Sequence, residues 1–114
     1  MHPEALDAED TKLITLARAA RARVGATEGA AVRDGDGRTY AAATVTLPSL
    51  SLTALQLAAA SAVAAGARKF EAAAVVTESS QVDDPSLATV RDVTPGISVH
   101  LAGPDGIVRR TIPA

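Results

Sequence analysis

The chain has 114 residues, a common size for one folded domain and too short for two, so we expect a single domain over residues 1–114. Hydrophobic residues make up 47% and charged residues 21%, which is typical of a globular rather than a disordered chain. A net charge of −2 argues against a basic surface for DNA or an anionic membrane, and the lack of cysteine excludes disulfides, thiolate metal ligands and cysteine nucleophiles.

The first predicted element is a helix that begins with acidic residues. We expect residues 1–6, which precede it, to form a frayed tail. Asp7, Glu9 and Asp10 suit a helix N-terminus, where carboxylates meet the positive end of the helix dipole. Leucine and alanine then recur at helical spacing, which predicts an amphipathic helix that ends near Arg23. Because the acidic start lacks the basic and apolar pattern of a signal peptide, we expect a cytoplasmic protein.

An antiparallel hairpin is predicted next. Residues 29–32 form a short apolar strand, the segment from Asp34 to Gly37 has the composition of a tight turn, and residues 38–45 form the return strand. Asp34 and Asp36 have the alternate spacing of a calcium loop, but no third ligand or bidentate glutamate follows at the required offsets. We therefore interpret both aspartates as turn residues.

The middle of the chain predicts an uncharged helix. Pro48 opens this helix, Ser49 or Ser51 serves as its N-cap, and Gly66 ends it. The charge-free segment 47–67 is long enough to span a bilayer, but its hydroxyl residues and many alanines make it weakly hydrophobic. A helix buried on most sides within the protein is therefore favoured over a membrane span.

The remaining segments predict a central strand, a short helix and a second hairpin. The continuous apolar run over residues 72–77 is typical of a strand covered on both faces, which places it at the centre of a sheet. Residues 85–93 form a short helix, and residues 97–101 and 107–112 form strands on either side of a Gly-Pro-Asp-Gly turn. The predicted fold class is α/β, a three-layer α-β-α arrangement around a mixed five-stranded sheet, with element order αββαβαββ.

The two histidines of the chain do not suggest a metal centre. His2 lies in the expected tail, and His100 alternates with apolar residues in its strand, on the opposite face from Val99 and Leu101. We interpret His100 as a solvated or hydrogen-bonded strand residue, and nothing in the sequence marks a base or nucleophile partner for it. The sequence therefore predicts no metal site and no cofactor.

Several strings, in this order and spacing, resemble the small free-standing cytidine deaminases. Glu28-Gly29-Ala30-Ala31 stands where that family has a Val-Gly-Ala-Ala strand, and Asp36-Gly37-Arg38-Thr39-Tyr40 matches its turn and second strand. The helix that ends at Gly66 and the strand from Lys69 to Val76 also match. The likeness runs from about Leu6 to Arg110 and implies the cytidine deaminase-like fold. The chain looks in particular like small actinobacterial proteins of a degenerate type that lack the zinc motif.

The catalytic signature of that family is altered here. Its deaminases hold zinc with a Cys or His on the second helix and with both cysteines of a Pro-Cys-x-x-Cys at the start of the third, while a Glu shuttles protons. In this chain the second helix has Leu55 in that region and no Cys, His or Glu. Ser86 and Thr89 stand where the two cysteines would be. Neutral hydroxyls are poor zinc ligands. The Asn-Val-Glu that grips the nucleoside sugar appears as Thr44-Val45-Thr46. We call the residues that would line this altered site the vestigial cleft: Thr44, Thr46, Thr53, Leu55, Gln56, Pro85, Ser86 and Thr89.

The resemblance without the signature predicts a non-catalytic, cytidine deaminase-like binding or accessory module. We expect a homo-oligomer, a dimer or tetramer, because one sheet face cannot cover every side of the uncharged helix from Ser49 to Ala65. The family commonly assembles as homotetramers with such helices near the centre. A protein partner or a small ligand would bind the vestigial cleft, and neither a membrane nor DNA is expected.

Three alternatives remain open. The first is a cytidine deaminase despite the altered signature. The second is a metal-independent enzyme in which hydroxyls of the cleft work with a carboxylate such as Glu78 or Asp83. The third is an RNA- or ribosome-associated accessory protein, against which the negative net charge and the scarcity of aromatic residues both argue. The arginines that would contact phosphate in that case are Arg18, Arg21, Arg23, Arg109 and Arg110.

Overall fold

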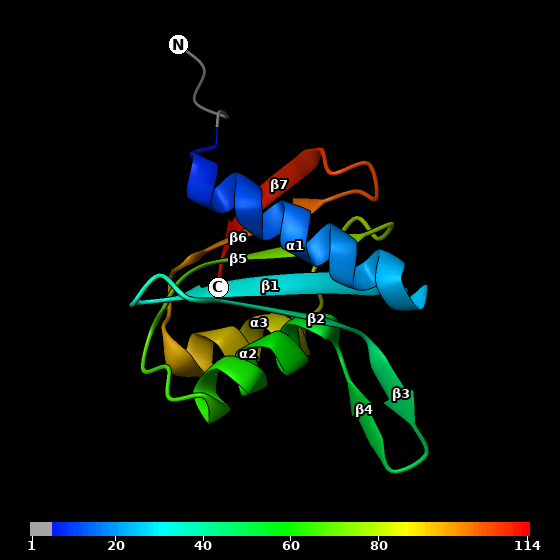
Figure 1. The fold of residues 1–114 in the computed structure, drawn as a ribbon, viewed down its shortest axis with the longest axis horizontal. Coiled ribbons are helices and arrows are strands. Elements are labelled where there is room, and N and C mark those ends of the chain that lie inside the picture. The colour runs from blue at the N-terminus through cyan, green and yellow to red at the C-terminus, as the bar shows by residue number, and fades with distance from the viewer. Residues whose placement is uncertain (1–5) are drawn as a thin grey trace.

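The protein is described by a computed structural model over residues 6–114, with helices on both sides of one main sheet (Figure 1). Residues 6–114 form three helices and seven strands, so their element order is αββββαβαββ. The bounds are α1 (Ala8–Val24), β1 (Glu28–Asp34), β2 (Thr39–Ala43), β3 (Val45–Leu47), β4 (Leu50–Leu52), α2 (Ala54–Ala64), β5 (Phe70–Thr77), α3 (Asp84–Val93), β6 (Ser98–Ala102) and β7 (Val108–Pro113).

The main sheet has five strands in the order β2-β1-β5-β6-β7. β5 pairs antiparallel with β1 and parallel with β6, whereas β1–β2 and β6–β7 are antiparallel hairpins. The predictions of a mixed five-stranded sheet and of a central strand over residues 72–77 are therefore confirmed. Both predicted hairpins are confirmed as well.

The sheet separates two hydrophobic clusters, which confirms the three-layer arrangement. α1 covers one face and α2 and α3 cover the other, as Figure 1 shows. Small side chains let the layers approach closely. A Cβ at Gly29 in β1 would overlap the carbonyl oxygen of Ala17 and would lie 2.8 Å from the backbone nitrogen of Arg21. α1 thus packs directly against the backbone of β1, which requires glycine at this position.

The start of α2 differs from the prediction. Residues 49–52 are not helical, because Pro48 and Ser49 form the turn of a small hairpin in which β3 pairs with β4. The helix begins at Ala54, and neither Ser49 nor Ser51 caps it. Its N-cap is Thr53, which forms a capping box with Gln56. The predicted helix from Ser49 to Ala65 is therefore shortened to Ala54–Ala64.

The ends of the other elements agree with the prediction to within a few residues. Asp7 is the N-cap of α1, and its side chain accepts a hydrogen bond from the backbone N–H of Asp10 at 2.8 Å. Residues 1–5 of the expected tail, which include His2, lie outside the described residues, whereas Leu6 packs against the hydrophobic cluster beneath α1. Within residues 6–114, no helix has the length and hydropathy needed to cross a bilayer.

Asp34 serves the turn between β1 and β2, as predicted. Its side chain is buried and accepts hydrogen bonds from the backbone N–H groups of Asp36 and Arg38, both at 2.9 Å, and from the Tyr40 hydroxyl at 3.2 Å. A carboxylate that satisfies two turn amides holds the loop in one conformation. The interpretation of Asp34 as a turn residue is confirmed.

Candidate functional site

The N-termini of α2 and α3 meet at a pair of hydroxyl groups. The Ser86 hydroxyl donates to Thr53 Oγ1 at 2.7 Å, and the same Thr53 oxygen accepts the backbone N–H of Gln56 at 3.0 Å. Asp83 caps α3 by accepting the backbone N–H of Ser86 at 3.1 Å. Ser86 is only 2% exposed, so this bond joins the two helices inside the protein. Pro85, in the first turn of α3, lies at the surface beside it.

Two other residues of the vestigial cleft, Leu55 and Thr89, do not bond to this hydroxyl pair. Leu55 is 1% exposed and belongs to the hydrophobic core beneath the sheet. Thr89 lies one turn further along α3, where its hydroxyl donates to the Pro85 carbonyl oxygen at 2.9 Å. The structure therefore brings Thr53, Gln56 and Ser86 together, while Leu55 and Thr89 make separate contacts.

Thr44 and Thr46 lie at the small hairpin. Thr44 Oγ1 donates to the Glu28 carbonyl oxygen at 3.3 Å and accepts the Glu28 backbone N–H at 3.2 Å, which fixes the start of β1. Thr46 pairs with Ser51 across the hairpin and is exposed. Both threonines line a groove of about 420 Å³ between the end of α1, β2, β3 and α2, whose other walls are mainly alanine, valine and leucine.

Glu28, at the start of β1, interacts with Asp83, the N-cap of α3, and is not among the residues predicted for the cleft. Burial raises the pKa of its carboxyl above the usual value, the negative charge of Asp83 raises the pKa further, and a hydrogen bond from Thr77 lowers it. The residues come from the start of β1, the end of β5 and the N-cap of α3. The only sequence signal for Glu28 was its place before the Gly-Ala-Ala string, which carries no chemistry of its own.

The residues of the vestigial cleft do not fit a zinc ion. The hydroxyls of Ser86 and Thr53 bond to each other, the Thr89 hydroxyl bonds to a carbonyl oxygen, and Leu55 has no lone pair to donate. Across residues 6–114 there is no group of three or more histidine, cysteine, aspartate or glutamate side chains that could hold a metal ion.

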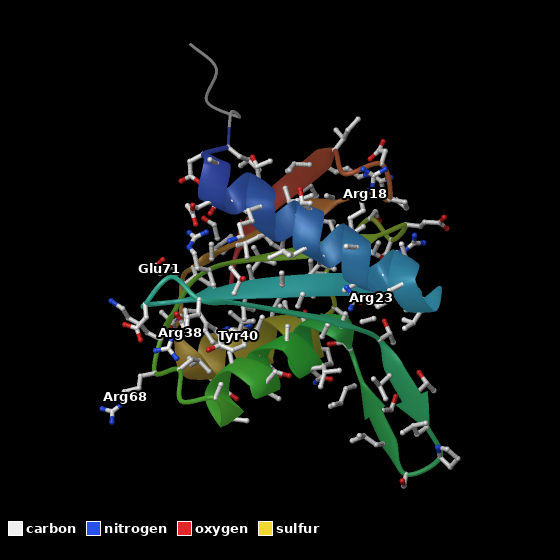
Figure 2. All side chains as sticks on the ribbon, viewed as in Figure 1. Arg18, Arg23, Arg38, Tyr40, Arg68 and Glu71 are labelled. Atoms are coloured by element: carbon white, nitrogen blue, oxygen red, sulfur yellow. The ribbon has the colours of Figure 1, made fainter. Side chains whose placement is uncertain are left out.

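Three of the five arginines considered for phosphate contact are used within the fold. Three carbonyl oxygens accept their hydrogen bonds: that of Pro104 from Arg18 Nε at 2.8 Å, that of Thr27 from Arg21 Nε at 3.2 Å and that of Ser80 from Arg110 Nη1 at 3.4 Å. Figure 2 shows Arg18 reaching toward the turn between β6 and β7. These side chains connect α1 and β7 to neighbouring loops.

A polar network lies between α1 and the sheet, on the face opposite to the vestigial cleft. His100 Nε2 lies 2.8 Å from Asp10 Oδ2, and His100 Nδ1 lies 2.8 Å from Thr111 Oγ1. Arg33 Nη1 forms an ion pair of 2.9 Å with Asp10 Oδ1 without the alignment of a hydrogen bond, and Arg33 Nε donates to Glu71 Oε1 at 3.0 Å. Glu71 lies at the end of the sheet over which α1 begins (Figure 2).

His100 satisfies one of the two alternatives of its prediction, a solvated or hydrogen-bonded strand residue. It points away from the face of Val99 and Leu101, and it is hydrogen-bonded and buried, at 3% exposure. The reason is that α1 covers this face of β6 and contributes Asp10 as a partner. The sequence could not indicate this contact, because Asp10 and His100 are 90 residues apart.

We expect Asp10 to make stability dependent on pH in the acid range. Burial raises the pKa of its carboxyl, but hydrogen bonds and the charges of His100 and Arg33 outweigh burial and hold the pKa below the usual 3.8. The stabilisation is therefore complete above pH 3.8 and is lost as the pH falls through the lower value in the folded state. In urea titrations between pH 2 and 6, roughly the range in which carboxylates protonate, the free energy of unfolding of Asp10→Asn should fall less steeply with decreasing pH than that of the parent. An equally steep fall in both proteins would contradict this assignment.

Comparison with known proteins agrees with the fold and the order of its elements. The family model described as Cytidine deaminase-like matches residues 6–106. The structure is similar to that of a cytidine deaminase from Burkholderia pseudomallei, with a TM-score of 0.79 and 29% identity over 90% of each chain. It also has the fold of a cytidine deaminase from Mycobacterium leprae, with a TM-score of 0.72 and 20% identity over 94% of each chain. No curated protein sequence matches the chain. The chain belongs to the cytidine deaminase-like family.

Proposed function

We propose that this protein is a cytidine deaminase-like binding module whose cleft does not carry out zinc-dependent deamination. The observation that carries the proposal is the bond of 2.7 Å between Ser86 and Thr53 at the meeting point of α2 and α3. At one of the two positions where the resembling enzymes would place a cysteine, this chain has Ser86, whose hydroxyl is bonded to Thr53. The bond joins the starts of α2 and α3.

The cleft keeps features that suit a polar ligand. The starts of α2 and α3 meet here, and backbone N–H groups at helix N-termini favour acceptor groups of a ligand. Glu28, with its raised pKa, adds a carboxyl that keeps its proton to a higher pH than an ordinary glutamate does. A small polar molecule or a polar segment of a partner protein fits this chemistry.

The test of this proposal is a deamination assay with saturating cytidine and added zinc. We expect no ammonia release above the rate without protein, because neither the metal ligands nor the proton-shuttling glutamate of the family is present. The Burkholderia pseudomallei cytidine deaminase, which the structure resembles, serves as the positive control in the same assay. Turnover that is abolished by Ser86→Ala would contradict the proposal, because it would make the vestigial cleft an active site.

We propose further that the protein is a homo-oligomer that buries the outer side of α2. Several apolar residues on α2 and the small hairpin face solvent in the single chain, including Val63, 48% exposed, Leu47, 56% exposed, and Leu50, 48% exposed. Exposed apolar groups of this kind on a small protein favour an interface. A second copy of the chain would cover them.

Two substitutions test the oligomer without disturbing the core. Ala60 and Ala64 are exposed on α2, so Ala60→Glu and Ala64→Glu should leave each chain folded but place a charge in the interface. We expect both variants to sediment at the mass of a single chain while the parent sediments as a dimer or tetramer. Ala19→Glu, exposed on α1 on the other side of the sheet, is the matched control and should sediment like the parent. A monomeric parent, or variants with its mass, would refute the placement.

A further inference from the structure

Thr111, His100 and Asp10 form a continuous hydrogen-bonded chain that leads from the surface into the protein. Thr111 is exposed on β7, His100 is buried on β6, and Asp10 reaches them from the first turns of α1. Both imidazole nitrogens lie 2.8 Å from an oxygen, Nδ1 from the Thr111 hydroxyl and Nε2 from the Asp10 carboxylate. A hydroxyl that contacts an imidazole which a carboxylate orients is the arrangement of an activated nucleophile.

The direction of each hydrogen bond follows from Asp10. Arg33 lies 2.9 Å from Asp10 Oδ1 and keeps the carboxyl ionised, so that Asp10 can only accept a hydrogen bond. In the neutral imidazole of His100 this bond places the proton on Nε2, which leaves Nδ1 with a free lone pair. The Thr111 hydroxyl therefore donates to Nδ1, as a nucleophile does to its general base.

The backbone N–H of Thr111 is a hydrogen-bond donor beside the Thr111 hydroxyl. β7 is at the edge of the sheet, and no described strand pairs with its outer side. The Ala114 N–H bonds to the Ile97 carbonyl oxygen at 2.9 Å. Along an antiparallel pair, residues whose N–H points toward the partner strand alternate with residues whose N–H points away from it. Thr111 lies three residues before Ala114, so its N–H points away from β6 toward the open edge. An N–H group beside the nucleophile can stabilise an oxyanion.

A hollow lies beside these residues. It has a volume of about 310 Å³, and its lining includes Thr11, the residue after Asp10 on α1, and Val108, three residues before Thr111 on β7, but not Asp10, His100 or Thr111 themselves. Leu6, Ile14 and Val108 supply apolar walls, and the remaining lining residues are Thr11, Thr15, Arg18, Asp105 and Gly106. A hollow of this composition fits a short apolar acyl chain.

We propose that Thr111 is the nucleophile of an acyl-transfer site, with His100 as general base and Asp10 as the residue that orients His100, and that its substrates are carboxylic esters with a short apolar acyl group. The Thr111 oxygen bonds to the ester carbonyl carbon while its proton moves to His100 Nδ1. The tetrahedral intermediate expels the alcohol, which takes that proton, and leaves an acyl ester on Thr111. Water then attacks with the same proton transfers, releases the carboxylic acid and restores the hydroxyl. This site is separate from the vestigial cleft and does not depend on the function proposed for it.

The test uses an alkyl fluorophosphonate, because the Thr111 oxygen would bond to phosphorus, fluoride would leave and the proton would pass to His100. Intact-mass and peptide mass spectrometry should find one adduct per chain, on Thr111. Thr111→Val should abolish the adduct and Thr111→Ser should retain it, and His100→Gln should slow labelling by about 100-fold, the usual scale for loss of a general base. Thr39→Val, a strand threonine on β2 at the far edge of the sheet, is the control and should label like the parent.

A purely structural network makes the opposite prediction. In that case His100→Gln lowers the melting temperature but leaves labelling unchanged, and the reagent modifies Thr111 no faster than Thr39. Either result, or no adduct on Thr111 in folded parent protein, overturns the proposal. Circular dichroism on each variant separates loss of labelling from loss of the fold, and Thr111→Val with Thr111→Ser decides the outcome if His100→Gln does not fold.

Discussion

Arg33→Met is expected to lower the free energy of unfolding by about 3–5 kcal/mol, the range found when one partner of a buried ion pair is removed. The Arg33 side chain is 11% exposed and pairs with Asp10 and Glu71. Without it, the carboxylate of Asp10 stays beneath α1 with His100 as its remaining partner, and α1 loses its ionic contact with β1. Urea denaturation at pH 7 measures the effect.

Arg38→Met is the matched control for that experiment. Arg38 carries the same charge on the same hairpin, but its side chain is 64% exposed and its ion pair with Asp36 spans 3.4 Å at the surface. Exposed pairs of this kind contribute between zero and about 1 kcal/mol. Equal losses for Arg33→Met and Arg38→Met would mean that the network under α1 does not stabilise the fold.

Gly29→Ala is expected to cost about 1–3 kcal/mol or more, the usual scale for overpacking a close contact. The added methyl group would overlap the Ala17 carbonyl oxygen, which belongs to the backbone of α1 and cannot rotate away. The helix must therefore shift as a whole, which would also strain the contact between Asp10 and His100. Thermal and urea unfolding both report this loss.

Gly35→Ala separates the steric effect from the general effect of replacing glycine. Its new Cβ would meet carbon atoms of the Lys69 side chain, a flexible group that can move aside. We expect a change well below that of Gly29→Ala. If the two variants lost the same stability, the close approach of α1 to β1 would not be the cause.

The main sheet could be predicted from the sequence because its signals are local. The run of apolar residues over 72–77 indicates a strand buried on both faces, and the Asp-Gly-Asp-Gly turn fixes the first hairpin. The small hairpin was missed although a signal was present. Leu50 and Leu52 alternate with Ser51 and Thr53, a period of two, but the preceding Pro48-Ser49 also resembles a helix start.

The vestigial cleft could be predicted only in part. The resemblance identified the residues at the starts of α2 and α3, but the bond between Ser86 and Thr53 joins positions 33 residues apart and has no sequence pattern. The network under α1 was missed for the same reason. Asp10 was predicted at a helix start and His100 as a solvated or hydrogen-bonded strand residue, and only the packing of α1 on β6 brings them together.

The most direct test of the cleft is the zinc content of untagged protein, measured by elemental mass spectrometry after incubation with zinc and removal of the excess. Ser86→Cys with Thr89→Cys provides the comparison, since it restores two thiols at the positions of the family's cysteines. We expect the parent to retain no zinc and the double variant to retain more zinc than the parent. One zinc ion bound per parent chain, and lost on Ser86→Ala, would contradict the account, because it would make the hydroxyl pair a metal site.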